Sequence, residues 1–550
     1  MVCLTSLTKA ATVDVDLAKV TNTNAPLLFG EAFDARTSFA INDQPIGYYS
    51  PVDGSPLAIG QYWEDNHRQT SLRYPMAPIN VWNWKATVDP FKAPQPLVGN
   101  NVAQFGLDEF FEMTDRNGMP ASEVHMMVNI YRDVNNVDHA GAVQDAADLV
   151  AYLNKPWDGV STFAGSNWEA LRAANGHPEP YGVELFNLGN EPWAFTEYDY
   201  RTSLDANPAL NGAKRYAADM ADFAAAMKGV DPGVKLTLSA AGPTTNPIRL
   251  AQAHAWNQTL VDDLGSEIDG LSVNLYYDSQ TPSMHGVNVM QSGLDHLDAI
   301  TTAHNQLGGN QLQVMIGEHA HAIHLDQNNQ PIEPGDPDFA MQWQGAVGTA
   351  DFLMMIANLD YVERAHFFIY GNGQAVWHPM RLDGYDGQGN PLYTVLPAAK
   401  LYELLGPLVL DEALDVATSS AASLDGEDYS IRGGAFRSAD KSLLTVVLVN
   451  RDSLPQDVDL LGLAGYSPIS AQLLTSTGPL GETIDVAGLV ALPNGSYTLP
   501  GLSIAIVQFQ AVPEPTSGSI FCVSLLTLAA GFARRDRRRC SQSTSRHERG

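Results

Sequence analysis

The chain has 550 residues, with 62 acidic and 31 basic side chains and a net charge of −31 at neutral pH. This balance argues against binding of nucleic acid or anionic lipid through a broad basic face, and it favours a soluble, self-repelling surface. The three cysteines, Cys3, Cys522 and Cys540, lie in the extreme ends, so the body of the chain contains neither a disulfide nor a thiolate metal site.

An alternating segment from Ala11 to Leu17 predicts a first strand. After it, eight apolar runs recur with helical or loop sequence between them, which is the pattern of a closed parallel barrel. These runs lie at 27–33, 71–74, 123–130, 183–188, 234–240, 270–277, 313–318 and 364–370. Alanine-rich apolar spacing at 211–228 and 346–359 predicts two helices of the outer ring.

After Leu405 the chain changes to short strands separated by turns, which predicts a β-sandwich. The predicted fold is therefore α/β: a (β/α)8 TIM barrel with a C-terminal β-sandwich that also takes the N-terminal strand. We expect four segments: an N-terminal segment and strand at 1–24, the catalytic barrel at 25–405, the sandwich at 406–511 and a tail at 512–550.

The fourth predicted strand ends in Asn190 and Glu191, followed by Pro192. Proline cannot continue a strand ladder, so Glu191 is expected at the carboxyl end of this strand, where such barrels expose their reactive groups. The alternative is a surface turn in which both side chains only satisfy backbone groups.

The seventh predicted strand ends in Gly317 and Glu318. Two acids at strand ends of one barrel point into the same mouth. Cleavage of a glycosidic bond requires a protonated leaving group on one side and an anion on the other, which two carboxyl groups supply. The pair predicts a glycosidase, although a structural, salt-bridged role for Glu318 is the alternative.

Five segments have a pattern shared with known enzymes: 105–110, 127–129, 171–180 and, upstream, 72–75 and 82–84. Through them, and most closely from Phe105 to Glu191, the chain resembles the α-L-arabinofuranosidase family of clan A glycoside hydrolases; the resemblance extends over about residues 12–511. It implies a retaining enzyme that acts on plant or algal polysaccharide without a cofactor, with Glu191 as acid/base and Glu318 as nucleophile. A glycosidase of another linkage and a non-catalytic polysaccharide-binding envelope protein are the alternatives.

The predicted substrate-binding residues surround these two acids. Asn190 is expected to bind the sugar's 2-hydroxyl, while Tyr276 and Arg73 are expected to hold Glu318 and keep it ionised. The full predicted set is Asn190, Arg73, Tyr276, Asn274, Asp34, Asn129 and Trp193. His319 and His321 lack the carboxylate spacing of a metal site, so we expect loop or subsite residues there.

Several positions depart from the pattern that the resembled family usually has. Met76-Ala77-Pro78 stands where Gly-Gly-Asn is usual, Asp34 replaces a longer acid, and Asn274 replaces a histidine. A site built on hydrogen bonds to hydroxyl groups discriminates strongly. The substitutions therefore predict weaker activity on simple arabinofuranosides than on some other glycoside.

The C-terminal tail contains Pro513-Glu514-Pro515, an apolar run at 519–533 and an arginine-rich end at 534–539. It resembles the PEP-CTERM sorting signal of Gram-negative envelope proteins, which implies export to the envelope or beyond, processing by an exosortase and contact with the membrane only through this short apolar segment. A disordered tail is the alternative. Residues 1–11 lack an apolar signal core, so we expect the true start to lie upstream.

Overall fold

The computed structural model describes residues 10–512 except for 35–37, 42–43, 51–52, 77–78, 95–101, 103, 132–137, 194–199, 201–207, 245, 278–285, 309, 323–338, 371–376, 378, 389–390, 423–427 and 494. The predicted sorting tail after Val512 lies outside the described residues. Within them, no helix combines the length and the apolar character needed to cross a bilayer.

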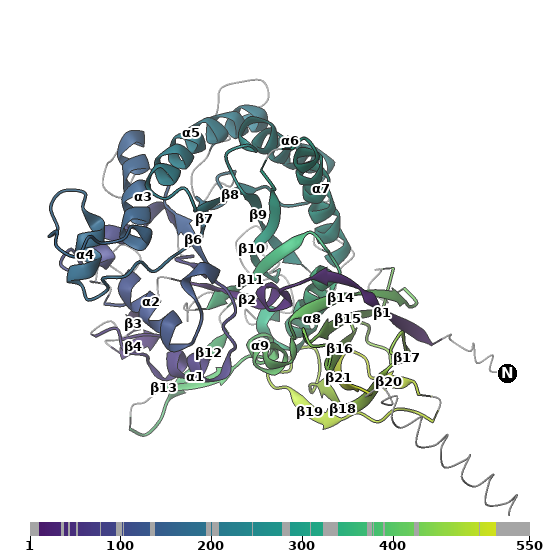
Figure 1. Ribbon diagram of the computed structural model, residues 1–550. Helices are drawn as coiled ribbons and strands as arrows, with labels where there is room; N and C mark the ends of the chain where they lie inside the picture. Colours follow the sequence, from purple (N-terminus) through teal and green to yellow (C-terminus); the bar gives the residue numbers. More distant parts are fainter. Residues whose placement is uncertain are drawn as a thin grey trace, which may run out of the picture.

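Eight parallel strands close into a barrel, which Figure 1 shows at the centre of the molecule. In closing order they are β10 (Gln313–His321), β11 (Val362–Tyr370), β2 (Gly30–Phe33), β5 (Leu72–Tyr74), β6 (Val124–Val128), β7 (Leu185–Leu188), β8 (Lys235–Ala240) and β9 (Gly270–Tyr277). Each of the eight predicted runs contributes one barrel strand, so the predicted barrel is confirmed.

Most strand bounds differ from the prediction by one to three residues, and two of these differences have a clear local cause. Residues 25–29 form a 3-10 helix, η1 (Ala25–Phe29), in which Pro26 lies at the start and favours a helical turn over a strand. Strand β10 continues to His321, because Leu275, Tyr276 and Tyr277 of β9 extend alongside it. Glu318 therefore lies inside its strand and not at its end.

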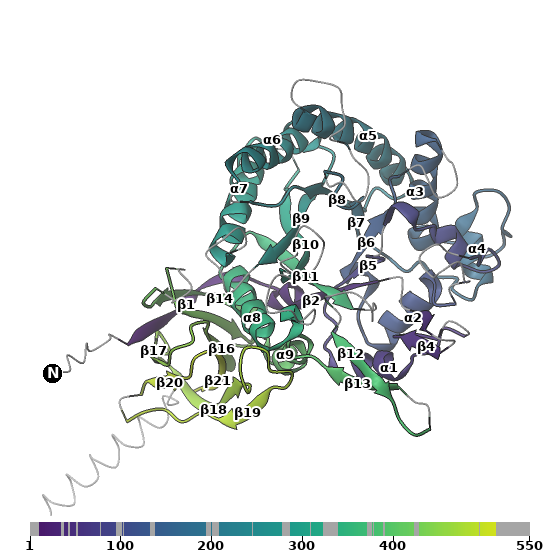
Figure 2. The ribbon, with the colours of Figure 1, turned by 180° about the vertical axis from the view of Figure 1, so that it is seen from behind.

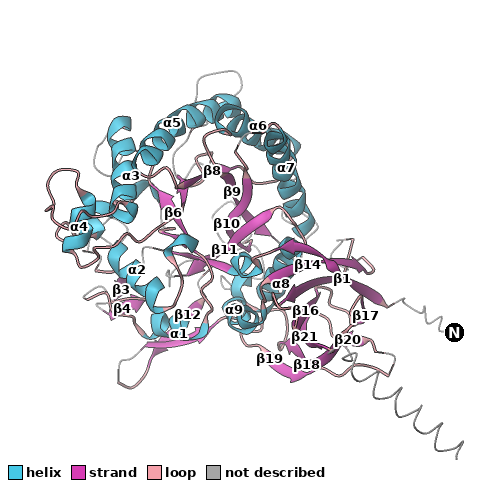
Figure 3. Ribbon diagram, in the orientation of Figure 1, coloured by secondary structure: helices cyan, strands magenta, loops and turns pink. Residues whose placement is uncertain are grey.

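Helices surround the barrel in a ring (Figure 3). They are α1 (Ala58–Asn66), α2 (Leu107–Arg116), α3 (His139–Asn154), α4 (Trp168–Ala174), α5 (Pro208–Val230), α6 (Pro247–Leu264), α7 (Val287–Gln306), α8 (Trp343–Ala357) and α9 (Pro397–Leu405). Side-chain caps stabilise the starts of two of these helices. At α3 the Asp138 carboxylate accepts the Gly141 N–H at 2.9 Å, and at α2 the Glu109 carboxylate accepts the Gly106 N–H at 2.8 Å. Both helices predicted from alanine-rich spacing are present, as α5 and α8.

The second domain is a curled nine-stranded sheet (Figure 2). Its order is β19 (Asp485–Gly488), β18 (Tyr466–Thr475), β21 (Ser503–Ala511), β16 (Leu443–Asn450), β15 (Ile431–Arg437), β14 (Glu412–Ser419), β1 (Ala11–Asn22), β17 (Gln456–Leu461) and β20 (Tyr497–Leu499). As predicted, the N-terminal strand joins it: β1 pairs with β14 antiparallel and with β17 parallel. The faces of the predicted sandwich belong to one continuous hydrogen-bonded sheet.

Helix α8 lies between barrel and sheet and is buried over its whole length. The Trp343 indole N–H donates to the Leu502 carbonyl at 2.8 Å. On the same junction the Phe29 ring packs edge-on against Phe436 at 5.7 Å. Buried contacts of this kind hold the two domains together.

The remaining elements are short. Two hairpins, β3 (Ser38–Ile41) with β4 (Gln44–Gly47) and β12 (Met380–Tyr385) with β13 (Pro391–Val395), follow barrel strands. Further 3-10 turns are η2 (Ile79–Val81), η3 (Trp84–Thr87), η5 (Ala121–Glu123), η6 (Phe339–Met341) and η7 (Gly406–Leu408).

Candidate active site

Glu318 is held by two donors from neighbouring strands. Arg73 Nη1, from β5, donates to Glu318 Oε1 at 2.8 Å, and the Tyr276 hydroxyl, from β9, donates to Oε2 at 2.6 Å. Only 1% of Arg73 and 3% of Glu318 are exposed. An ion pair and a short hydroxyl bond in low dielectric stabilise the anionic form of Glu318 and leave each of its oxygens with a partner.

Gly317 makes this arrangement possible. The pairing of β10 with β9 is irregular between Ile316 and Glu318, so the strand bends where Glu318 enters the mouth. A Cβ atom on Gly317 would lie 2.6 Å from Ser272 Oγ and 3.2 Å from the guanidinium carbon of Arg73. A larger residue would push the arginine away from Glu318.

Glu191 lies three residues beyond β7 in a strained backbone conformation, with a φ of 41°. Nearby, Gly189 has a φ of 76° and packs so closely on Ile130 that a Cβ would lie 2.6 Å from its Cδ1. The Tyr131 hydroxyl braces the turn by donating to the Asn190 carbonyl at 2.8 Å. Non-glycine residues at such φ values cost on the order of 1 to 3 kcal/mol and are concentrated at functional sites.

The surroundings of Glu191 favour its protonated form. Desolvation, followed by the negative charge of Glu318, raises the pKa of Glu191 to about 7, against smaller lowering effects of Asn274 and Arg73. A like charge nearby disfavours a second ionised carboxyl group. The mouth therefore holds one anion, Glu318, and one group that exchanges a proton near neutral pH, Glu191.

Two amides connect the carboxyl groups. Asn190 Oδ1 accepts from Arg73 Nη2 at 2.9 Å and from Asn274 Nδ2 at 3.3 Å, and Asn274 Nδ2 also donates to Glu191 Oε1 at 2.9 Å. The Asn190 oxygen thus has two donors, while its amide N–H groups have no hydrogen-bond partner among the described residues. Of the predicted site residues, the structure thus brings together Glu191, Glu318, Asn190, Arg73, Tyr276 and Asn274.

Three predicted binding residues have other contacts. Asn129 bridges backbone groups, donating to the Trp82 carbonyl at 2.9 Å and accepting the Tyr131 N–H at 2.8 Å. The Trp193 indole N–H donates to the Ala240 carbonyl at 3.2 Å, and the ring is half-buried. Asp34 is fully buried after β2; the pKa of the Tyr74 hydroxyl is raised mainly by burial, with Glu109 and Asp34 adding to it.

The loop placement that was one of the two predictions for His319 and His321 was wrong, because both are buried inside strand β10. The His319 ring nitrogens lie 3.3 Å from the Tyr277 and Tyr402 hydroxyls, and burial lowers the pKa of this histidine to about 3. Successive side chains of a strand point to opposite faces, so His319, which follows Glu318, points away from the mouth. Among the described residues, no group of three or more His, Cys, Asp or Glu side chains is placed to hold a metal ion.

The sequence analysis did not assign a role to three residues that shape the site: Tyr131, Gly317 and Met76. The roles of Tyr131 and Gly317 depend on side chains from other strands. For Gly317 the sequence does offer a signal, because this glycine directly precedes a predicted catalytic acid. Met76, noted only as a departure, has a φ of 25° and is 4% exposed, and its Sδ accepts from Arg73 Nη1 at 3.0 Å. Ala77 and Pro78 lie outside the described residues.

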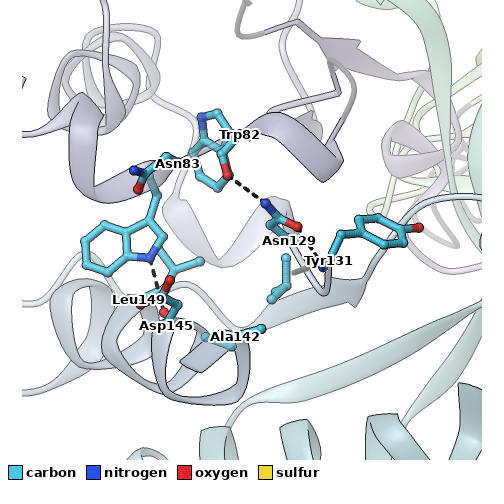
Figure 4. A pocket seen from close by; sticks show the side chains of 10 residues that line it. Trp82, Asn83, Asn129, Tyr131, Ala142, Asp145 and Leu149 are labelled. Carbon is cyan, nitrogen blue, oxygen red and sulfur yellow. Dashed lines mark hydrogen bonds between the residues drawn. The ribbon is translucent and has the colours of Figure 1, made fainter. Parts of the chain in front are cut away.

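A small cavity lies beside Asn129 and Tyr131 (Figure 4). Its volume is about 30 Å³, and its walls include Trp82, Asn129, Tyr131 and Leu149. Room for one or two water molecules is present, which is too little for a sugar ring. The cavity shares Tyr131 with the turn that carries Glu191.

Comparison with known proteins identifies the central part of the barrel. Residues 72–270 match the Alpha-L-arabinofuranosidase 1 domain. The chain is 25% identical over 234 residues to an intracellular exo-alpha-(1->5)-L-arabinofuranosidase of Bacillus subtilis, a match that covers 41% of this chain and 40% of the relative. An exo-alpha-(1->6)-L-arabinofuranosidase of Bifidobacterium longum is 24% identical over 217 residues, covering 38% and 35%. The matches thus span well under half the length of these relatives.

Solved structures extend the likeness over both domains. A family 51 alpha-L-arabinofuranosidase from Bifidobacterium longum has a TM-score of 0.69 at 18% identity, covering 91% of this chain and 99% of that one. For the Thermotoga maritima alpha-L-arabinofuranosidase in complex with arabinose, the TM-score is 0.65 at 17% identity, with 91% and 100% covered. BuGH86 in complex with neoagarooctaose has a TM-score of 0.55 at 15% identity, with 91% and 79% covered. The chain therefore has the fold of these solved glycoside hydrolases over both domains, and residues 72–270 of its barrel match an arabinofuranosidase domain.

Proposed function

We propose that this protein is a retaining glycoside hydrolase in which Glu318 is the nucleophile and Glu191 the acid/base. The observation that carries the proposal is the contrast between the two carboxyl groups. Glu318 has a guanidinium and a hydroxyl on its oxygens, whereas Glu191 has a pKa raised to about 7. An enzyme that first donates and then removes a proton works best with such a group.

The first step forms a covalent intermediate. A Glu318 oxygen attacks the anomeric carbon while Glu191 gives its proton to the glycosidic oxygen; the bond between that carbon and oxygen breaks, and the aglycone leaves as an alcohol. Arg73 and Tyr276 keep Glu318 anionic and oriented before the attack.

The second step releases the sugar. Glu191, now a carboxylate, takes a proton from water, whose oxygen attacks the anomeric carbon and displaces Glu318. The Asn190 amide N–H groups are available for the sugar's 2-hydroxyl, an interaction that strengthens in the transition state.

The domain match and the similar enzymes favour an arabinofuranosidic substrate, and we propose a plant or algal polysaccharide as its source. Met76 favours a different sugar, because its thioether accepts from Arg73 Nη1 beside the nucleophile, at a position where the resembled family usually has a glycine without a side chain. A buried polar group left without a partner costs about 1 to 3 kcal/mol, so this exchange alters which hydroxyl pattern is accepted. A related glycoside is therefore proposed as the best substrate, with simple arabinofuranosides weaker.

The test is a panel of aryl glycosides and of marine and plant polysaccharides, followed by NMR of the first-formed product. A retaining enzyme releases the sugar with the anomeric configuration of the substrate. Inversion would contradict the double displacement, and the absence of hydrolysis across the panel would favour a polysaccharide-binding protein. An aryl α-L-arabinofuranoside as the best substrate would contradict the changed specificity.

We also propose that the tail from 512 to 550 is an export and sorting device, cut by an exosortase-type enzyme in the envelope of a Gram-negative bacterium. The last sheet strand, β21, ends at Ala511, before the tail begins. A chain ending at Val512 should remain folded and active. Loss of activity on this truncation alone would show that the tail belongs to the catalytic unit.

A further inference from the structure

Asn274 holds a central place between the two carboxyl groups. It lies on β9 directly opposite Glu318 of β10 and is half-buried. Its Nδ2 is 2.9 Å from Glu191 Oε1, and a Cβ built on Gly317 would lie only 3.0 Å from its Oδ1. The missing side chain at Gly317 therefore provides the space in which this amide lies.

The orientation of the amide selects one oxygen of Glu191. Because Asn274 donates to Oε1, the proton of the acid form is directed to Oε2. The same N–H stabilises the carboxylate that remains after the proton has left. An amide does not titrate, so it performs both tasks unchanged over the whole working pH range.

The charged and titratable groups that face Glu191 come from three strands. Glu318 of β10 disfavours its ionisation, while Arg73 of β5 favours it. The Tyr276 hydroxyl of β9 stays protonated, since desolvation and then Glu318 raise its pKa well above the usual value. Among the described residues, the side chain that donates a hydrogen bond to the Glu191 carboxyl group is Asn274; Arg73 and Tyr276 donate to Glu318 instead.

We propose that Asn274 is a positioning residue for the acid/base: its N–H fixes Oε1 of Glu191, so that Oε2 delivers the proton to the glycosidic oxygen. This inference rests on the proposed function, since it assigns Asn274 a part in the same proton transfer. It replaces the direct sugar contact expected from the sequence.

The consequence is visible in the pH profile. In Asn274→Ala the carboxylate of Glu191 loses a stabilising donor, so the pKa of Glu191 rises and the alkaline limb of kcat/KM moves up by about one pH unit. Proton delivery becomes less well directed at the same time. Substrates with poor leaving groups need that proton most, so their kcat should fall at least about tenfold more than that of substrates with good leaving groups.

The experiment compares dinitrophenyl, nitrophenyl and phenyl glycosides of the best sugar across pH, with three enzymes. Asn274→Ala should show the shifted limb and the dependence on leaving group. Asn274→Asp keeps the shape but replaces the donor by another carboxylate, and should move the alkaline limb further up. Asn310→Ala removes an amide three residues before β10 begins, at the opposite end of the strand from Glu318, where Nδ2 donates to the Ser266 carbonyl at 2.8 Å; it should affect all leaving groups alike and leave the limb unmoved.

Equal losses for all leaving groups in Asn274→Ala, with an unmoved limb, would overturn the proposal and assign Asn274 to sugar binding. Carbon-13 NMR of glutamate carboxyl groups, assigned with Glu191→Gln, gives a readout without turnover: the Glu191 titration should move up in Asn274→Ala. An unshifted titration in an active enzyme overturns only the role of Asn274. A wild-type enzyme without any glycosidase activity overturns the proposed function itself.

Discussion

Two buried carboxylates of this molecule have the same kinds of partners, one arginine and one tyrosine hydroxyl, and differ in their next neighbour. Glu318 in the barrel mouth is the first. Asp351 on helix α8 is the second: it is fully buried, and it accepts from Arg432 Nε and from the Tyr429 hydroxyl, each at 2.6 Å.

Each cluster consists of a carboxylate, an arginine, a tyrosine and one further neighbour, and this further neighbour determines the role of the cluster. Beside Glu318 stands another carboxyl group, Glu191, whose pKa rises to about 7 through desolvation and this like charge. Beside Asp351 stands a second guanidinium, Arg451, with its Nε at 3.5 Å. The mouth thus has an excess of acid and exchanges a proton near neutral pH. The junction has an excess of arginine around one buried carboxylate, so it serves to join α8 to the sheet.

The largest expected effect is on turnover, in Glu318→Gln. Removal of the nucleophile should lower kcat/KM by roughly 10⁵-fold, because no covalent intermediate forms. Stability should change less, since Glu191 can then ionise and supply the counter-charge for Arg73. Steady-state kinetics and chemical unfolding of the same preparations measure both effects. Residual turnover within tenfold of the wild type would exclude Glu318 as nucleophile.

The junction should give the opposite result in Asp351→Asn. Two buried guanidinium groups lose their shared counter-ion, a loss that typically costs about 3 to 5 kcal/mol of unfolding free energy. The kcat of the folded fraction should stay the same, because α8 contributes no group to the barrel mouth. Arg451→Met is the matched control and should cost less, since Arg432 still pairs with Asp351. A strong fall in kcat without a fall in stability would contradict the division of roles.

The fold could be predicted from the sequence more fully than the two side-chain clusters around Glu318 and Asp351. Buried parallel strands such as Leu185–Leu188 are mostly apolar, here with Asn187 as the one polar residue, and this local signal needs no partner. Glu191 was also found locally, because Pro192 marks the end of its strand. The contacts of Asn274 and the inward turn of Glu318 depend on the irregular pairing at Gly317, which no local pattern encodes. Likewise, Asp351 on α8 contacts Arg432 and Arg451 only because the sheet packs against this helix.

A smaller effect should appear in the pH dependence of stability of Glu191→Gln. The folded-state pKa of Glu191, about 7, lies above its usual value of 4.5, so the stability linked to its proton is present below pH 4.5 and is lost as the pH rises through 7. Glutamine never ionises. Relative to wild type, the variant should therefore gain about 2 to 3 kcal/mol more at pH 8 than at pH 5.

Urea unfolding at the two pH values measures this gain, with Glu191→Asp as the control that keeps a titrating group. A gain that is the same at both pH values would show that Glu191 ionises in the native mouth at its ordinary pKa. The junction offers the counterpart: Asp351→Asn should destabilise the protein at both pH values, because the arginines of that cluster stay charged throughout.

The smallest expected effect concerns backbone strain at residues with a positive φ, and its consequences should differ between the barrel mouth and the sheet. Four non-glycine residues among the described part of the chain have a positive φ: Met76, Glu191, Lys441 and Leu502. Lys441, with a φ of 60°, lies in the turn between β15 and β16, where glycine adopts the same conformation freely. Lys441→Gly should therefore raise the unfolding free energy by up to about 1 kcal/mol and leave kcat unchanged.

Glu191→Gly relieves the same kind of strain in the mouth, yet it should lower turnover of substrates with poor leaving groups by about 10²-fold or more, since the general acid is lost. Thermal unfolding and kinetics of the two variants side by side make the comparison. If Lys441→Gly lowered activity as well, strain in the sheet would be coupled to the mouth. The opposite behaviour of the two clusters could then no longer be explained by their immediate neighbours alone.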